Sequence, residues 1–334
     1  MSDPICVEVL RGNTVESVHT GAAAIVDGDG KVVAAIGEIE RPVFSRSAIK
    51  LFQALPLIET GAADAYRLDE KALALACASH NGEEAHVAVA SDTLKRAGLD
   101  LHALECGAHW SMSQPVAIEQ AKAGIEPTPL HNNCSGKHSG FLCVCQHQKI
   151  SYKGYIQRDH PLQTMLADVM QNVTDARHDP QEAGIDGCGI PTYAVPLKNT
   201  ALGFARLASG NGVGASRAAA ARRLMQSCMN EPFYVAGTGR ACGKLMQAAP
   251  GRVFVKMGAE GIYTGAVPEL GMGIALKCDD GGVRGAEVMI AALLAKLFRS
   301  EPEIAARFDE IAHPLMKNWV GTPIGEMRPA AAIL

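Results

Sequence analysis

A serine and a lysine three residues apart stand in the stretch FSRSAIKLF, residues 44–52. Residues at i and i+3 share one face of a helix, so Lys50 can reach the Ser47 hydroxyl. A serine hydroxyl is a weak nucleophile, and a lysine accepts its proton only when the lysine pKa falls from about 10.4 towards 7–8. The apolar run around Lys50 lowers its pKa if the amine is buried. The pattern therefore predicts a nucleophile and its base, although a lysine that extends from the core to water has the same neighbours.

Two further triplets follow along the chain, SHN at residues 79–81 and KMG at residues 256–258. Together with S-x-x-K they parallel the S-x-x-K, S-D-N and K-T-G motifs of serine β-lactamases and penicillin-binding proteins. The order is the same, and the three motifs fall on a helix start, a turn and a strand. The departures are His80 in place of aspartate and Met257 in place of threonine. Read together, the triplets favour a hydrolase that uses serine and lysine.

Lys256 and Ser79 complete the predicted chemistry. A second cation at Lys256 lowers the pKa of Lys50, and Ser79 can pass a proton between the two lysines. Backbone N–H groups at the start of the Ser47 helix can hold a tetrahedral oxyanion. Two simpler interpretations stay open, namely that Ser79 only caps a helix and that Lys256 faces water from a strand edge.

Cysteine, lysine and histidine gather in HNNCSGKHSGF, residues 131–141, and a second cysteine lies in DGCGIP, residues 186–191. Two thiolates with a nitrogen or oxygen donor suit a tetrahedral zinc site. Cys134 with His138 could instead form a nucleophile–base pair, or the cluster could be structural. The stretch GTGR, residues 237–240, resembles a phosphate-binding loop, but no strand and helix flank it in the way such a loop requires.

The hydrophobic periodicity changes along the chain and predicts the architecture. Residues 5–37 read as strands, with Asp-Gly-Asp-Gly as a hairpin turn, and residues 46–249 read mostly as helices. Residues 251–282 read as three strands, and an apolar helix follows at 285–298. Asn81 is expected to cap the helix predicted over residues 81–99, with Glu84 three residues on in a capping-box arrangement. We therefore predict an α+β fold, in which N- and C-terminal strands form one mostly antiparallel sheet flanked by helices, with an inserted helical region.

Composition excludes several classes of protein. The chain has 334 residues, a net charge of −4 and a pI near 6.3, which argues against nucleic acid or an anionic membrane as a partner. No uninterrupted apolar run is long enough to span a bilayer, and the first residues do not read as a secretory signal. The ten cysteines contain no C-x-x-C pair and fit a reducing compartment, so a cytoplasmic protein is expected.

The stretches RSAIKLFQALPL, CASHNGE, HNNCSGKHSGFL, RDHPLQ and DGCGIPTYAVPL together resemble the rhizobial-type (class 3) L-asparaginases. The resemblance spans residues 8–330. It implies a serine β-lactamase-like fold, hydrolysis of L-asparagine to L-aspartate and ammonia, and a homodimer. It also implies a single catalytic domain over residues 1–334, with its sheet part at about 1–45 and 250–334 and its helical part at about 46–249.

The same resemblance implies catalytic roles for four residues. Ser47 matches the family's nucleophile, Lys50 its partner lysine, and Ser79 the second serine. Lys256 matches the second lysine, which faces that serine. Acyl-enzyme chemistry on Ser47, with Lys50 as base, is therefore expected.

The remaining matched positions imply a metal and a substrate site. Cys134, Lys137 and Cys188 match a zinc site near the reacting serine, where zinc would support substrate binding. A lysine must bind zinc as the neutral amine, so affinity should fall as pH falls. The substrate contacts are expected to be Arg46, Asn81, His138 and Asp186, with Arg46 suited to a carboxylate and Asp186 to an ammonium group.

Other functions remain open at this point. A zinc-dependent amidohydrolase would use the same site with the metal as catalyst, and a β-lactamase-like serine hydrolase or a glutaminase would use the same serine. A non-catalytic zinc or amino-acid sensor would release no ammonia. Release of ammonia from asparagine at about one turnover per second or faster would exclude the sensor.

Overall fold

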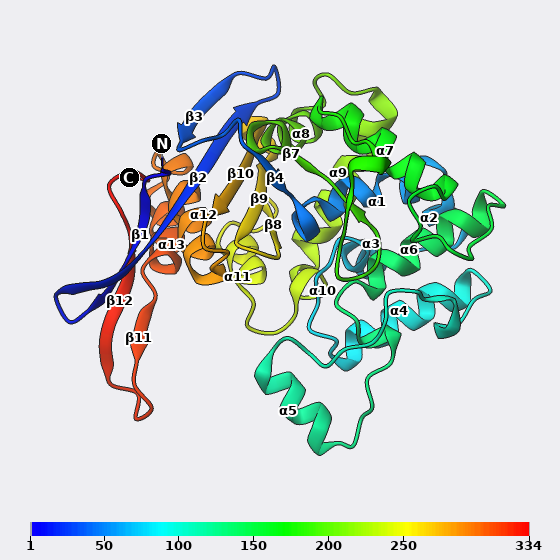
Figure 1. Ribbon diagram of the computed structural model, residues 1–334, viewed down its shortest axis with the longest axis horizontal. Coiled ribbons are helices and arrows are strands. Elements are labelled where there is room, and N and C mark those ends of the chain that lie inside the picture. The colour runs from blue at the N-terminus through cyan, green and yellow to red at the C-terminus, as the bar shows by residue number, and fades with distance from the viewer. Residues whose placement is uncertain (1, 334) are drawn as a thin grey trace.

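One eight-stranded sheet joins the two ends of the chain in the computed structural model, which describes residues 2–333 (Figure 1). The strands pair in the order β11-β12-β1-β2-β10-β9-β8, with β3 beside β2, and every pairing is antiparallel. Their bounds are β1 Ile5–Arg11, β2 Thr14–Asp27, β3 Val32–Ile36, β8 Phe254–Gly258, β9 Ile262–Val267, β10 Met272–Cys278, β11 Leu315–Lys317 and β12 Pro323–Pro329. The N-terminal strand β2 lies between β1 and the C-terminal strand β10, so strands from both ends of the chain share one sheet, as the sequence predicts.

Helices cover both faces of this sheet. On one face α8 (Leu197–Ser209) packs on β2 and β10, and on the other α12 (Val283–Leu297) packs on β9 and β10. In β2, Ala22, Ala24 and Val26 belong to the core on the α8 side, whereas Ala23 and Ile25 belong to the main core. The run AAAIV is therefore apolar at every position because both faces of its strand are buried.

Most of the other helices form a separate layer beside the sheet, on the right of Figure 1, whereas α13 packs against α12, and α11 packs against β8 and α13. Their bounds are α1 Lys50–Glu59, α2 Ala62–Ala65, α3 Glu70–Ala76, α4 Glu84–Arg96, α5 Gln114–Lys122, α6 Ser135–His147, α7 Pro161–Thr174, α9 Ala215–Asn230, α10 Pro232–Ala236, α11 Ala241–Ala248 and α13 Pro302–Ala312. Three short strands accompany this layer, β5 (Gly184–Ile185), β6 (Pro191–Thr192) and β7 (Ala194–Pro196). Among the described residues, no helix is both long and apolar enough to cross a membrane.

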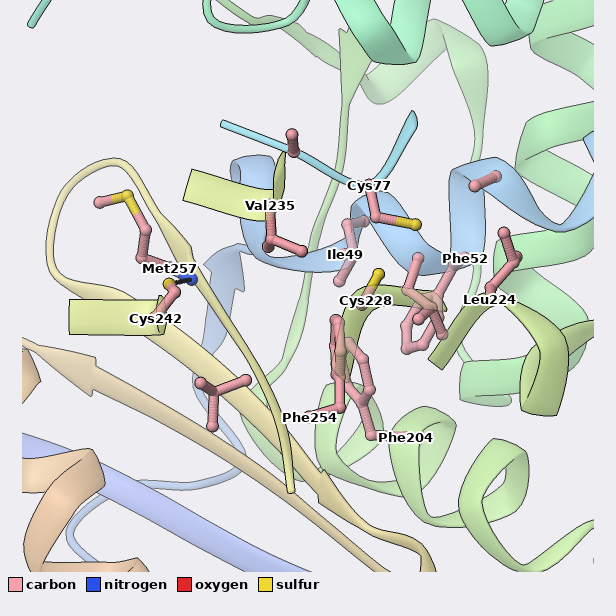
Figure 2. Close-up of a cluster of buried hydrophobic side chains, with 14 of the residues drawn as sticks. Ile49, Phe52, Cys77, Phe204, Leu224, Cys228, Val235, Cys242, Phe254 and Met257 are labelled. Atoms are coloured by element: carbon pink, nitrogen blue, oxygen red, sulfur yellow. Dashed lines mark hydrogen bonds between the residues drawn. The ribbon is translucent and has the colours of Figure 1, made fainter. Parts of the chain in front are cut away.

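Helix α1 runs through the middle of the helical layer. Its residues from Lys50 to Leu57 are all buried, because α6, α7 and α9 surround it. Figure 2 shows Phe52 of this helix beside Phe204, which stacks on Phe254, and these three rings join the helical layer to the sheet. A lysine at the first position of so enclosed a helix cannot extend to water, which rules out the surface interpretation of Lys50.

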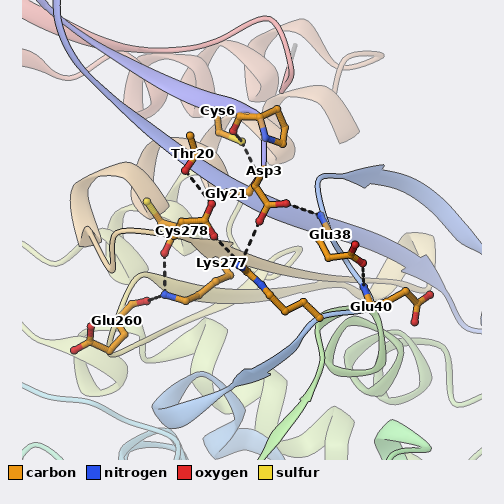
Figure 3. Close-up of polar contacts among 12 residues, drawn as sticks. Asp3, Cys6, Thr20, Gly21, Glu38, Glu40, Glu260, Lys277 and Cys278 are labelled. Carbon is orange, nitrogen blue, oxygen red and sulfur yellow. Dashed lines mark hydrogen bonds and ion pairs between the residues drawn. The ribbon is translucent and has the colours of Figure 1, made fainter. Parts of the chain in front are cut away.

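The segment before the helical layer is tied to the sheet by polar contacts (Figure 3). Asp3 accepts a hydrogen bond from the Glu38 backbone at 2.7 Å and pairs with Arg41 at 3.1 Å. Lys277 donates to the backbone carbonyls of Glu260 and Cys278. The Asp3 contacts hold the loop that enters β4 (Pro42–Phe44), and β4 leads directly to Ser47, whereas the Lys277 contacts hold the turn between β8 and β9.

The predicted fold class is confirmed, since a mostly antiparallel sheet from both ends of the chain encloses a helical insertion. The three strands at 251–282, the helix after them and the turn between β2 and β3 are present as predicted. The predicted cap of α4 was wrong. The helix begins at Glu84, and Glu83 caps it in a reciprocal arrangement with His86, which leaves the Asn81 side chain free for other contacts.

Candidate active site

Ser47 lies in a short 3₁₀ turn, Arg46–Ile49, between β4 and α1. Arg46 has φ +47°, a left-handed conformation that is rare for a residue other than glycine and that concentrates at functional sites. The turn is held from two sides: Ser45 Oγ shares a hydrogen bond with Thr200 Oγ1 at 3.0 Å, and Thr264 Oγ1 donates to the Ala48 carbonyl at 2.8 Å. Helix α8 and strand β9 therefore fix the backbone that presents Ser47.

Gly258 lets strand β8 lie directly against this turn. A Cβ atom on Gly258 would stand 3.0 Å from both the Ala48 nitrogen and the Ser45 carbonyl oxygen, and 2.5 Å from a methyl group of Ile262. Any larger residue would push the strand away from the turn of Ser47. The glycine of the KMG triplet therefore has a steric role in bringing Lys256 and Ser47 into one site.

The side chains of Lys50, Ser79 and Lys256 form a buried hydrogen-bonded chain. Ser79 Oγ lies 3.0 Å from Lys50 Nζ and 2.9 Å from Lys256 Nζ. Both lysines are 0% exposed, and Ser79 is 4% exposed. Lys50 Nζ also donates to the Ala78 carbonyl and lies 3.1 Å from Cys134 Sγ. The three residues come from α1, the turn before α4 and β8, so residues far apart in sequence meet at one hydroxyl.

Lys256 is the lysine whose charge is suppressed. Burial lowers its pKa from an ordinary value of 10.5 to about 7, and the positive charges of Lys50 and Arg240 add to this effect. A neutral amine has two N–H donors and one lone pair. One N–H of Lys256 reaches the Met257 carbonyl at 2.7 Å, so its lone pair can accept the Ser79 proton.

The hydroxyl groups of Ser47 and Ser79 differ in burial and in hydrogen bonding. Ser79 is enclosed by two amines, whereas Ser47 is half-buried and its hydroxyl makes no hydrogen bond within residues 2–333. Lys50 follows Ser47 by three residues, and side chains at that spacing eclipse in a 3₁₀ turn. The structure places the Lys50 amine on Ser79, and the Ser47–Lys50 hydrogen bond is not formed in this state. Ser79 therefore carries the enclosed hydroxyl of the site, and Ser47 carries the accessible one.

The three expected metal ligands converge beside this chain. Lys137 Nζ lies 3.0 Å from Cys188 Sγ, and the Cys134 and Cys188 thiols share a hydrogen bond. That hydrogen bond, with the nearby Lys137 charge, lowers the pKa of Cys188 to about 5. The same contact together with burial raises the pKa of Cys134 to about 12. Two sulfurs and one amine of this kind fit the donor preferences of zinc.

His138 directs an unpaired nitrogen into the same region. It is fully buried, its Nδ1 lies 2.7 Å from the Tyr155 hydroxyl, and its Nε2 has no partner in the described part of the chain. The Tyr155 oxygen already accepts a hydrogen bond from the Glu105 N–H at 3.0 Å. The tyrosine proton is then free to bond to Nδ1, which assigns the histidine proton to Nε2. His138 thus offers a hydrogen-bond donor rather than a metal-binding lone pair.

Arg46 and Asp186, expected at the two ends of the substrate, bind each other. Arg46 donates through Nε and Nη2 to the same Asp186 oxygen, at 3.1 and 2.8 Å. Although burial opposes it, this bond and the Lys137 charge lower the pKa of Asp186. The positive charge of Arg46 and the negative charge of Asp186 therefore neutralise each other within the protein.

Both polar atoms of the Asn81 side-chain amide form hydrogen bonds with other residues of the protein. Its Oδ1 accepts from Arg240 at 3.1 Å, and its Nδ2 donates to Glu83 at 3.3 Å and to the Thr238 carbonyl at 3.2 Å. The amide thereby joins the SHN turn to the GTGR loop. The sequence singles out that loop only for its likeness to a phosphate loop, so the arginine at its end was missed as a residue of the site.

The described residues hold one further group of potential metal ligands, His19, Cys278 and Asp280, whose ligand atoms lie within 4.8 Å of one another. Arg284 Nε donates to His19 Nε2 at 3.1 Å, so the histidine proton is on Nδ1, which lies 2.7 Å from Asp280. A metal at Nδ1 would move that proton to Nε2, where it would face the Arg284 donor. This cluster is therefore a hydrogen-bonded support for the sheet and does not fit a metal.

The known proteins that are similar to this chain include several solved structures and the members of one protein family. Solved structures similar to the chain include a β-lactamase from Mycobacterium bovis, at 15% identity and TM-score 0.40, covering 80% of this chain and 89% of that one. Another, described as a crystal structure analysis of Mglu, has 17% identity and TM-score 0.40, covering 84% of this chain and 67% of that one. None of the curated proteins matches significantly. The model of the L-asparaginase II family matches residues 7–329, and the chain belongs to that family.

Proposed function

We propose that this protein hydrolyses the side-chain amide of L-asparagine to L-aspartate and ammonia through an acyl-enzyme on Ser47. The observation that carries the proposal is the buried chain Lys50–Ser79–Lys256, which begins one turn after an accessible serine hydroxyl. Membership of the L-asparaginase II family supports an amide substrate of this kind. The resemblance implies a homodimer, and the cysteine content favours a cytoplasmic protein.

The relay provides Ser47 with a neutral base. A proton moves from the Lys50 ammonium to Ser79 Oγ while the Ser79 proton moves to the neutral amine of Lys256, so Ser79 gains one proton and loses one. Lys50 is then uncharged. Rotation of its side chain towards the preceding turn brings its lone pair to the Ser47 hydroxyl, and Ser47 attacks the amide carbon as Lys50 takes the proton.

Collapse of the tetrahedral intermediate returns that proton. Lys50 donates it to the departing nitrogen, which leaves as ammonia, and the aspartyl ester remains on Ser47. Water then attacks the ester, Lys50 takes the water proton, and the same proton restores the Ser47 hydroxyl as aspartate leaves. The N–H of Ser47 makes no backbone hydrogen bond within the described residues, so it is the available donor for the oxyanion.

Zinc is the expected cofactor, and Cys134, Lys137 and Cys188 would hold it. When bound there, the ion would supply positive charge that orients the polar groups of the substrate. Lys50 Nζ lies 3.1 Å from Cys134 Sγ, so the proposed metal site lies directly beside the relay. Loss of the metal is therefore expected to weaken substrate binding more than it slows the chemical step.

The proposal is tested by ammonia release from L-asparagine by purified Ser47→Ala and Lys50→Met variants. Each is expected to lose activity by about a thousandfold or more, because nucleophile and base act as a unit. Ser151→Ala and Lys153→Met change exposed residues and serve as matched controls. Near-normal activity in Ser47→Ala would remove Ser47 from the mechanism. Glutamine and a β-lactam in the same assay decide between an asparaginase, a glutaminase and a β-lactamase-like hydrolase.

A further inference from the structure

Arg240 carries a guanidinium group that has no carboxylate in ion-pair contact among the described residues, and its charge acts on Glu287, whose pKa burial raises and Arg240 lowers. Its Nη1 donates to the Asn81 side-chain oxygen at 3.1 Å, and its Nη2 lies 3.0 Å from Met257 Sδ. Both partners are uncharged, and Arg240 forms no ion pair with any carboxylate in the part of the chain that the structure describes. A half-buried guanidinium in such surroundings retains both its charge and free N–H donors.

The Arg240 guanidinium contacts two segments that also carry residues of the proposed active site. Met257 directly follows Lys256 on β8, and Asn81 follows Ser79 by two residues. The Arg240 charge also contributes to the low pKa of Lys256. Contacts from two elements and an electrostatic effect thus place Arg240 beside the relay.

The loop that presents Arg240 is held in place by the SHN turn. Glu83 accepts hydrogen bonds from the Thr238 N–H at 2.8 Å and from Thr238 Oγ1 at 2.7 Å. Gly237 has φ +107°, and a Cβ there would lie 2.6 Å from Asn81 Nδ2. The nearby Glu83 carboxylate is thus occupied by Thr238 and Asn81, which leaves the Arg240 guanidinium in a fixed position without a carboxylate in direct contact among the described residues.

The other arginine of the site differs in this respect, since Arg46 places two donors on Asp186. We infer that Arg240, rather than Arg46, binds the α-carboxylate of the amino-acid substrate and so selects it over neutral amides. The inference rests on the proposed amide hydrolysis and adds a specificity determinant to it. A guanidinium binds a carboxylate with two parallel hydrogen bonds, whereas lysine binds it as a point charge.

The test compares three amides in wild type, Arg240→Gln, Arg240→Lys and Arg46→Gln. The amides are L-asparagine, succinamate, which lacks the ammonium group, and 3-aminopropanamide, which lacks the carboxylate. Arg240→Gln is expected to lower kcat/KM for the two carboxylates by about 100-fold more than it lowers kcat/KM for 3-aminopropanamide. Arg240→Lys should recover part of the loss. Thermal unfolding of each variant verifies that it is folded.

Two results would overturn the inference. Equal losses on all three amides would show that Arg240 only holds Asn81 or tunes Lys256, and a selective loss in Arg46→Gln would assign the carboxylate to Arg46. Calorimetry of succinate binding to Ser47→Ala, with and without Arg240→Gln, measures the same contact without turnover. If wild type released no ammonia from any amide, the proposed function would fail, and succinate binding would still decide the role of Arg240.

Discussion

The suppressed charge of Lys256 predicts a pH-dependent change in stability. Lys256 keeps its proton up to about pH 10.5 in the unfolded chain but only up to about pH 7 in the folded protein. Between these values unfolding takes up a proton, so the free energy of unfolding of wild type rises with pH. Below about pH 7 both states carry the proton, and the full cost of a buried charge remains.

The size of the effect follows from the two pKa values. A pKa difference of one is equivalent to about 1.36 kcal/mol, so this lysine contributes about 4 kcal/mol of added stability between pH 7 and pH 10. Lys256→Met removes the titrating group and this dependence. The variant also loses the hydrogen bonds from Lys256 to Ser79 and to the Met257 carbonyl. The stability lost with these two bonds does not follow the titration of Lys256. The variant should therefore gain stability relative to wild type as pH falls.

Urea unfolding of wild type and Lys256→Met at intervals from pH 6.5 to 10 measures this difference. The gap between the two unfolding free energies should change by about 1.4 kcal/mol for each pH unit and level off near pH 7. Lys153→Met, at an exposed lysine, should show no such trend. Parallel curves for wild type and Lys256→Met would show that Lys256 stays protonated in the fold, and the proton relay would lose its acceptor.

Three further predictions concern the same site. Ser79→Ala should keep the fold but lower kcat by about 10²–10⁴, because the proton path is cut, and an unchanged kcat would eliminate the relay. Gly258→Ala should destabilise the protein by about 1–3 kcal/mol and reduce activity, since its Cβ meets the turn of Ser47, and thermal unfolding with kinetics tests this. Cys188→Ser should abolish stoichiometric zinc in elemental analysis and mainly raise KM, whereas a lost kcat at saturating substrate would favour the zinc-dependent amidohydrolase.

Much of the fold could be predicted because periodicity is local. The alternation in β8 to β10 and the apolar run of α12 identify their own structure, and a sheet that joins both chain ends follows from their order. The cap of α4 could not be predicted in this way. Asn81 has the right type and spacing for a cap, but its amide binds Thr238 and Arg240, which lie more than 150 residues away.

The site shows the same division between local and distant information. The S-x-x-K spacing identifies Ser47 and Lys50, yet it does not reveal that the Lys50 amine lies on Ser79 and Cys134 in this state. The pairing of Arg46 with Asp186 depends on the approach of a distant loop. Charge balance across such contacts is a property of the folded chain, and this is why Arg240 was found only after folding placed it between Asn81 and Met257.

The most direct test of the account is to identify which serine becomes acylated. Wild type is mixed with L-asparagine, quenched in acid within the first turnover, digested and mapped by mass spectrometry. The account predicts one aspartyl group on the peptide that contains Ser47, and none in Ser47→Ala. An aspartyl group on Ser79, or multiple turnover with no covalent adduct on either serine, would contradict it.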